Sequence, residues 1–312
     1  MSARLTVPLR GPGGEPVDLA RTLASHGVAS LPPMALDEKK LSFEVTLRVA
    51  KGRPRVVRVT PAPRNSVAIE VAGRAPGAAT ADEIERLVRR ILGLDQDLAP
   101  FYAAIKDDPD LAWAAAGAGR MIRSPTVFEE VVKTICTTNC AWSATVRMTT
   151  ALVEHLGEAA VGAPPDGWRG RAFPTPAAMA AAGEDFYRDV VRAGYRGRYL
   201  IALSEMVAGG SLDLEALAAT PEDELPDAEL AQRLQALPGV GPYAAAHIMM
   251  LTGRHSLLVL DSWTRPTYAR LTGKKKVSDA AIERRFRRYG RYRGLAFWLF
   301  LTRGWVDDEP TG

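Results

Sequence analysis

Residues 237–241 read Leu-Pro-Gly-Val-Gly and separate two segments whose apolar side chains recur at helical spacing. Glycine tolerates positive φ, and Pro242 suits the first turn of a helix because its missing N–H would be unpaired there anyway. We therefore expect the second helix to begin directly after Gly241, with free backbone amides at its start. Those amides and the helix dipole form an anion site that fits a phosphodiester. A bare Gly-x-Gly is common in ordinary helix–helix turns, but the whole pentapeptide between two amphipathic helices favours the anion site.

The periodicity of the chain changes near Thr80, from alternating to helical. Before this point residues 17–27 read as one short helix, and the alternation predicts strands over 41–49, 54–60 and 66–71. After this point Ser124 before Pro125 is typical of a helix start. The expected fold is mainly α: a small α+β N-terminal domain with an antiparallel β-sheet at residues 1–78, then a bundle of many helices at residues 79–312.

The composition is that of a folded globular protein, with 47% hydrophobic and 24% charged residues among 312. The formal net charge of +4 permits a polyanionic partner without proving one. No run of 18 apolar residues and no signal-peptide pattern is present, so we expect no membrane partner and a cytoplasmic location. Cys136 and Cys140 read better as small buried side chains than as metal ligands. None of the four histidines forms a ligand pair, so no metal and no cofactor are expected.

One carboxylate follows the glycine hairpin. Asp261 ends the apolar run 257–260 and precedes a segment that reads as a helix. Aspartate is a favoured N-cap, and residue type alone favours that structural role. The position beside a phosphate anchor adds a chemical role, because a carboxylate near the sugar of a gripped strand can stabilise an oxocarbenium-like sugar and orient a water.

Leu237–Gly241 followed by Asp261 resembles the signature of the helix-hairpin-helix (HhH-GPD) DNA glycosylase superfamily, in particular bacterial 3-methyladenine glycosylase II and the 8-oxoguanine glycosylases. The resemblance implies two helical subdomains with the active-site cleft between them. It implies Asp261 as the catalytic residue and Gly239, Val240 and Gly241 as the phosphate anchor. It further implies a monomer of base-excision repair, associated with a bacterial-type nucleoid, whose partner is double-stranded DNA containing a damaged base.

Two further segments resemble the 8-oxoguanine enzymes. In TICTTNCAW (134–142), Asn139 occupies the position of an asparagine that enters the gap left by the flipped base. In GYRGRYL (194–200), Tyr195 matches a tyrosine that wedges into the base stack, and Arg196 matches an arginine that contacts the orphaned base. Taken alone, these residues also suit a helix cap, a core aromatic and a solvated helix face.

The sequence departs from the family at one position that matters for the reaction. Members with lyase activity carry a lysine on the second hairpin helix, where this chain has Tyr243. No lysine occurs between Lys133 and Lys274, and a phenol cannot form the Schiff base that strand cleavage requires. We therefore expect a monofunctional glycosylase without strong lyase activity at abasic sites.

The identity of the damaged base is the least constrained feature of the sequence. Tyr243, Trp142 and Trp263 are candidates for a pocket that stacks the flipped base, although aromatic residues also fill helical cores. The expected order of substrates is alkylated purines of the 3-methyladenine type, then deaminated or mismatched pyrimidines, then oxidised purines. A non-catalytic protein that uses the hairpin to bind damaged DNA is the alternative from another class.

Basic residues dominate between Arg270 and Arg303, which suits either phosphate neutralisation or an ordinary solvated face.

Overall fold

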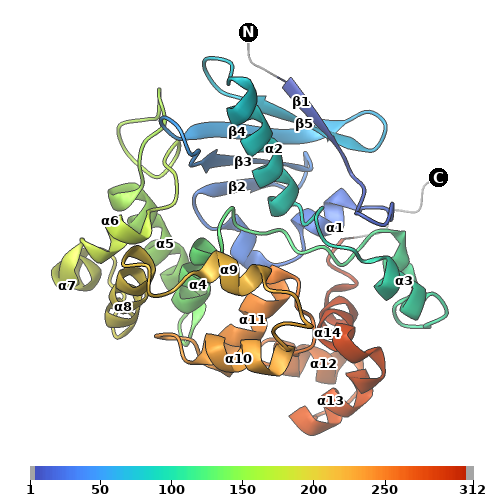
Figure 1. Cartoon of the computed structure of the whole chain (residues 1–312). Helices are drawn as coiled ribbons and strands as arrows, with labels where there is room; N and C mark the ends of the chain where they lie inside the picture. The colour runs from blue at the N-terminus through green and yellow to red at the C-terminus, as the bar shows by residue number, and fades with distance from the viewer. Residues whose placement is uncertain (1–3, 307–312) are drawn as a thin grey trace.

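The computed structural model describes residues 4–306. The N-terminal part is a five-stranded antiparallel sheet with the order β1-β5-β4-β3-β2 (Figure 1). Its strands are β1 (Arg4–Pro8), β2 (Met34–Asp37), β3 (Ser42–Leu47), β4 (Arg55–Ala62) and β5 (Ser66–Val71). The three strands expected from the alternation are β3, β4 and β5, and the fold class is confirmed. The edge strands β1 and β2 were not anticipated, because they are short, with five and four residues.

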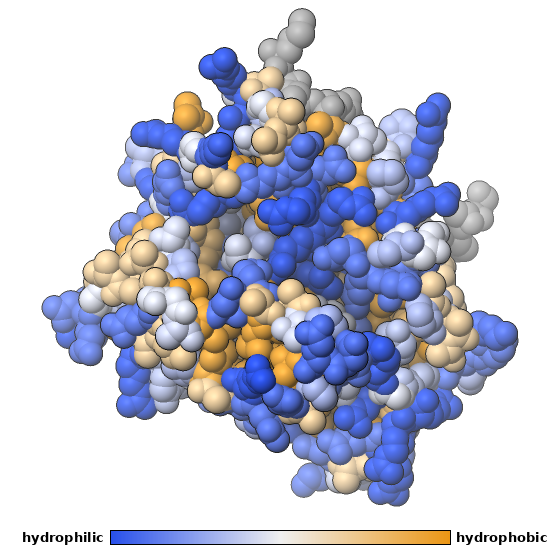
Figure 2. Space-filling view, viewed as in Figure 1, coloured by the Kyte–Doolittle hydropathy of each residue, from blue (hydrophilic) through white to orange (hydrophobic). Residues whose placement is uncertain are grey.

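The helix α2 (Ala78–Ile91) shares one hydrophobic core with the sheet. Its buried residues Ile84, Leu87, Val88 and Ile91 recur at helical spacing and lie in the same core as the strands. The opposite face of α2 is polar, and Figure 2 shows hydrophilic side chains across the middle of the molecule, where this helix lies. The core of the N-terminal unit therefore extends beyond residue 78.

The remaining elements are mostly helices (Figure 1). Two short ones lie between β1 and β2: α1 (Leu19–Leu23) and η1 (Gly27–Ser30). The following ones are α3 (Ala99–Ile105), η2 (Ala112–Ala116), α4 (Val127–Thr137), α5 (Trp142–Leu156), α6 (Pro176–Ala180), α7 (Gly183–Asp185), η3 (Phe186–Val190), α8 (Arg196–Ala208), α9 (Leu214–Ala219), α10 (Asp227–Gln235), α11 (Pro242–Thr252), α12 (Thr264–Leu271), α13 (Asp279–Phe286), η4 (Arg287–Tyr292) and α14 (Arg293–Thr302).

These helices form two hydrophobic cores that share α11. Ala245 and Met249 belong to a core with α4, α5, α8 and α10, whereas Ala246 and Met250 belong to a core with α3, α12, α13 and α14. The sequence of α11 is apolar on all sides, which is typical of a helix buried on every face. The central position of α11 places its N-terminus, and the hairpin before it, at the boundary between the two cores.

The start of α4 differs from the expectation. The helix begins at Val127, and its cap is Thr126, whose hydroxyl accepts a hydrogen bond from the Glu129 amide at 3.2 Å. Ser124 is instead buried, and its amide donates to the carboxylate of Glu130. Both Ser124 and Thr126 are suitable caps by residue type, so the choice depended on which of them the tertiary fold buries.

Between residues 4 and 306, no helix has the length and apolar character needed to cross a membrane.

The segment between β1 and β2 is fastened to the helical part by buried polar contacts. Arg120 and Glu15 form an ion pair at 2.5 Å between two almost fully buried side chains. His26 Nε2 bonds the carbonyl of Ile122 at 2.6 Å, and the ring is buried. Burial lowers the pKa of His26 from 6.5 to about 4, and the nearby charge of Lys133 lowers it further, against the effect of the Ile122 carbonyl.

We expect His26→Gln to flatten the pH dependence of stability. In the unfolded chain His26 becomes protonated below about pH 6.5, whereas in the folded chain it stays neutral down to about pH 4. The contribution of neutral His26 to the free energy of unfolding is therefore complete above pH 6.5 and decreases as the pH falls towards 4. At pH 5 the loss from this residue is about 2 kcal/mol. Urea titrations at pH 7 and pH 5 should show a smaller loss in the variant, whose amide can still donate to Ile122. Equal losses in the two proteins would contradict this origin.

Candidate functional site

The hairpin, the turn between α4 and α5, the start of α8 and the start of α12 surround one open cleft. The cleft has a volume of about 1060 Å³, large enough for a nucleotide. Both helical cores contribute to its walls, and Tyr243 packs against each of them. The cleft is lined by Thr137, Thr138, Asn139, Cys140, Tyr195, Tyr199, Gln235, Leu237, Gly239, Val240, Gly241, Pro242, Tyr243, Ala244, Leu260, Asp261, Ser262 and Arg265.

The hairpin has the geometry that its glycines allow. Gly239 has a φ of 79°, in the left-handed region, and a Cβ there would lie 3.0 Å from the side chain of Tyr199. Val240 is buried in the core and fastens the turn from inside. Gly241 is exposed and precedes α11, and no side chain within residues 4–306 caps this helix start. The first amides of α11 are therefore open to an anionic ligand at the edge of the cleft.

Asp261 has the capping role considered for it, and it also lines the cleft. Its Oδ1 accepts hydrogen bonds from the amides of Trp263 at 2.8 Å and Thr264 at 2.7 Å, while its own amide donates to the Thr264 hydroxyl at 2.8 Å. These bonds cap the start of α12 and hold the carboxylate in one orientation. Because Oδ1 is engaged by amides, Oδ2 is the oxygen available to a substrate in the cleft that Asp261 lines.

Tyr243 occupies the second position of α11, between the hairpin and Asp261. Its ring stacks on His247 with centroids 6.0 Å apart and an interplanar angle of 25°. Burial raises the pKa of the Tyr243 phenol above its usual value of 10, and the neighbouring Asp261 raises it further, against a hydrogen bond with Thr137. The phenol is therefore neutral at physiological pH and is no nucleophile.

Asn139 and Tyr195 meet at one wall of the cleft. Asn139 is exposed, has a φ of 47° and donates from Nδ2 to the Tyr195 hydroxyl at 3.4 Å. The Tyr195 ring is 48% exposed and packs edge-on against Tyr199. This pair gives the cleft wall polar and aromatic surface.

Arg196 lies elsewhere than its expected role requires. The side chain is buried, and its guanidinium packs over the ring of Tyr195 at 4.6 Å. Its Nε donates to the Thr138 carbonyl at 3.1 Å, and Nη1 donates to Ala193. Arg196 thus supports the turn that presents Asn139 from behind, and the side chain is absent from the cleft wall.

The two tryptophans expected in the pocket also lie outside the cleft lining. Trp142 begins α5 and is half-exposed, and a Cβ at Gly27 would be 3.8 Å from its ring. Trp263 packs against Trp298 and Trp305, with centroids 5.7 Å and 5.4 Å away. Its amide nevertheless bonds Asp261, so Trp263 anchors the backbone that carries this carboxylate.

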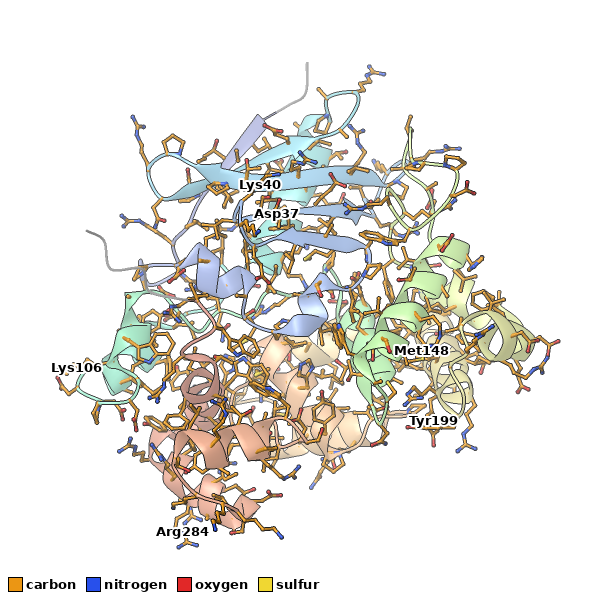
Figure 3. All side chains as sticks on the ribbon, turned by 180° about the vertical axis from the view of Figure 1, so that it is seen from behind. Asp37, Lys40, Lys106, Met148, Tyr199 and Arg284 are labelled. Carbon is orange, nitrogen blue, oxygen red and sulfur yellow. The ribbon has the colours of Figure 1, made fainter. Side chains whose placement is uncertain are left out.

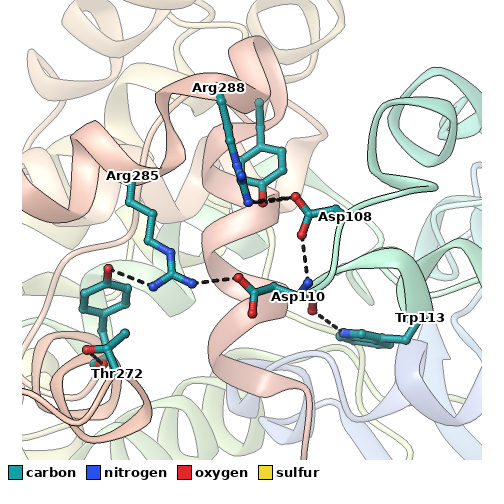
Figure 4. Close-up of polar contacts among 8 residues, drawn as sticks. Asp108, Asp110, Trp113, Thr272, Arg285 and Arg288 are labelled. Atoms are coloured by element: carbon teal, nitrogen blue, oxygen red, sulfur yellow. Dashed lines mark hydrogen bonds and ion pairs between the residues drawn. The ribbon is translucent and has the colours of Figure 1, made fainter.

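Several basic residues of the C-terminal segment form ion pairs within the protein. Arg285 pairs with Asp110 at 2.7 Å, and Arg288 pairs with Asp108 at 2.8 Å, which ties α13 and η4 to the segment after α3 (Figure 4). Arg284 on α13 lies far from Tyr199 of the cleft wall along the lower edge of the molecule (Figure 3). The charge excess of this segment therefore serves partly to join helices.

Sequence reasoning missed Thr137, Thr138, Gln235 and Arg265 as parts of the cleft wall. Arg265 carried a signal, since it lies one helical turn after Asp261 on the same helix start. The turn residues carried none, because nothing local shows that α4 ends opposite the hairpin. Within residues 4–306, no three His, Cys, Asp or Glu side chains gather into a group that could hold a metal ion.

Solved structures share this architecture over nearly the whole chain. The 3-methyladenine DNA-glycosylase from Archaeoglobus fulgidus aligns with a TM-score of 0.71 and 19% identity, over 98% of this chain and 100% of its own. The 8-oxoguanine glycosylase/lyase of Clostridium acetobutylicum aligns with a TM-score of 0.70 and 20% identity, over 96% and 97%. The chain has the fold of the helix-hairpin-helix DNA glycosylases. The resemblance in fold that the hairpin and Asp261 indicated is thereby confirmed.

The Clostridium enzyme is also known in complex with double-stranded DNA containing cytosine opposite 8-oxoguanine, and that structure aligns with a TM-score of 0.69 and 20% identity, over 97% of each chain. No protein-family model matches the sequence, and no curated protein matches it significantly.

Proposed function

We propose that this chain is a DNA glycosylase that binds double-stranded DNA, flips a damaged base into the cleft and hydrolyses its N-glycosidic bond. The observation that carries the proposal is the presence of Asp261 and the Gly239–Gly241 hairpin in the wall of one cleft. The fold shared with the Archaeoglobus and Clostridium glycosylases supports it.

The proposed reaction uses few groups. The hairpin amides hold a backbone phosphate, and Asn139 and Tyr195 fill the space that the everted nucleotide leaves in the helix. Asp261 Oδ2 stabilises the positive charge that develops on the sugar as the base departs, and orients the water that attacks C1′. The two amides on Oδ1 keep the carboxylate in position before the substrate arrives.

We further propose that the enzyme is monofunctional. No lysine is found among the residues that line the cleft, and the matching position carries the neutral phenol of Tyr243. Lys133 is buried, with Nζ 2.6 Å from a carboxylate oxygen of Glu129 and 3.2 Å from the carbonyl of Leu31. Water is therefore the nucleophile, and the product is an abasic site in an intact strand.

We propose alkylated purines as the substrate class. Tyr195, Tyr199 and Tyr243 give the cleft electron-rich rings, and Asp261 gives it a negative charge, both of which favour a cationic base. A methylated purine is already a good leaving group, so one carboxylate without a general acid suffices. The placement of Trp142 and Trp263 gives this class no support, because neither tryptophan lines the cleft.

The test is a panel of duplexes that each carry one modified base: 7-methylguanine, uracil, a thymine mismatch or 8-oxoguanine. We expect release of the alkylated purine, with strand breaks that appear only after alkali and no adduct trapped by borohydride. Release of uracil, thymine or 8-oxoguanine alone would change the substrate class. Breaks without alkali or a trapped adduct would overturn the monofunctional assignment, and binding without release of any base would identify a non-catalytic DNA-binding protein.

A further inference from the structure

Within residues 4–306, one positively charged side chain lines the cleft. Among its described lining residues, the charged ones are Asp261 and Arg265. The hairpin contributes backbone amides, which carry only partial charges. A DNA backbone brings a full negative charge with every nucleotide, and it must approach the carboxylate of Asp261 closely. Without a cation nearby, phosphate and carboxylate would repel each other in the cleft.

Arg265 is placed to supply this cation. It is the second residue of α12, and its amide contacts the Asp261 carbonyl at 3.4 Å. Its guanidinium is held by Asp279 through two parallel bonds, Nε to Oδ1 at 2.8 Å and Nη2 to Oδ2 at 2.9 Å. Both side chains of this pair are nearly half-exposed, with 42% and 47% of their surface accessible. Nη1 has no partner within residues 4–306 and is free to donate to a ligand.

The pair with Asp279 orients the guanidinium more than it stabilises the fold. Ion pairs exposed to this degree contribute little to stability, because water screens them. The bidentate bond fixes the plane of the guanidinium, which matters for a group that recognises planar or tetrahedral oxyanions through two donors. The hydrogen bonds that Arg265 donates to Asp279 raise the pKa of Arg265, and the charge of Asp261 adds to this effect.

We infer that Arg265 binds a DNA phosphate on the Asp261 side of the everted nucleotide, while the hairpin amides bind the backbone on the other side. Asp279 is a positioning residue for this contact. The sugar of the everted nucleotide lies between these two phosphate contacts, against the carboxylate of Asp261. This inference rests on the proposed function, because it presumes that DNA occupies the cleft.

The experiment measures binding without catalysis. A fluorescent duplex with a tetrahydrofuran abasic-site analogue is titrated with the full chain over a series of NaCl concentrations. Arg265→Gln is expected to weaken binding about tenfold at low salt and to reduce the slope of log K against log salt by about 0.9, the value for one lost phosphate contact. Asp279→Asn keeps the cation and is expected to retain the wild-type slope.

The control is Arg58→Gln on β4, which removes a more exposed arginine from an ion pair with Glu44 on the sheet. This variant should bind as the wild type does. A wild-type slope in Arg265→Gln would overturn the inference. If Asp279→Asn lost as much binding affinity and salt slope as Arg265→Gln, the inference would also be overturned. The ion pair would then act only by joining α12 to α13.

The outcomes separate this inference from the proposed function. In one outcome, wild-type protein binds the analogue and Arg265→Gln reduces the salt slope as expected, but no base is released from any duplex. This outcome would refute the glycosylase and support the phosphate contact. Wild-type protein that releases a base, with an unchanged slope in Arg265→Gln, would refute the phosphate contact alone. Wild-type protein that does not bind the duplex would refute both.

Discussion

Asp261→Asn should reduce base excision by a factor of about 10²–10⁴ while the protein remains folded and binds DNA. The asparagine side chain keeps an oxygen that accepts the hydrogen bonds from the Trp263 and Thr264 amides, so the start of α12 is preserved. It lacks the negative charge that, in the proposed mechanism, stabilises the developing oxocarbenium ion. Single-turnover release of the preferred base, measured beside binding of the abasic analogue, gives both quantities.

The control for this variant is Asp213→Asn. Asp213 caps α9 in the same way, accepting from the Ala216 amide at 2.9 Å, and it is not part of the cleft lining. It should excise at the wild-type rate, with the same melting temperature within a few degrees. Excision retained in Asp261→Asn would remove the carboxylate from the mechanism and with it the proposed assignment of the site.

Gly239→Ala should destabilise the protein and weaken DNA binding about tenfold or more. The φ of 79° is unfavourable for alanine, and the new Cβ would lie 3.0 Å from the Tyr199 ring and Cβ. Strain in the left-handed region costs about 1–3 kcal/mol, and relief of the contact would shift Tyr199 in the cleft wall. A turn that relaxes in this way moves the first amides of α11 from the geometry that receives a phosphate. Thermal denaturation and duplex binding measure the two effects.

Gly241→Ala is the matched substitution in the same turn. Gly241 has a φ of −93°, which alanine adopts without strain, and a Cβ there would meet nothing within 4 Å. Its unfolding free energy should stay within about 0.5 kcal/mol of the wild type. Equal destabilisation in both variants would show that the hairpin tolerates no side chain at all, which contradicts a special role for positive φ at Gly239.

The features that sequence predicted well are those determined by neighbours along the chain. A proline after two glycines starts α11, and an aspartate three residues before a helix caps α12, whatever the rest of the molecule does. The strands β3, β4 and β5 followed from alternation in the same way. The cap of α4 was predicted at the wrong residue. Ser124 is buried, and its amide donates to the carboxylate of Glu130, six residues later.

The side chains that sequence placed less well are those whose partners come from distant segments. An arginine such as Arg196 is expected at a surface, but here the carbonyl of Thr138, 58 positions earlier, binds it behind the cleft wall. Trp263 is two residues from Asp261, yet its ring packs on α14 rather than into the cleft. Large aromatic rings go where area can be buried, and only the packing of helices determines where that is.

The sequence by itself determined the local devices of this protein: the bent glycine turn, the helix start with open amides, the capping carboxylate and the absence of a lysine beside them. Each depends on backbone angles and hydrogen bonds within a few residues, so the order of amino acids is sufficient. Only the tertiary structure decided that these devices face one cleft, that Asn139 and Tyr195 form its wall, and that Arg265 is its one described cationic side chain. These positions depend on how the helices of the two hydrophobic cores pack around α11. This packing brings together residues more than a hundred positions apart in the sequence.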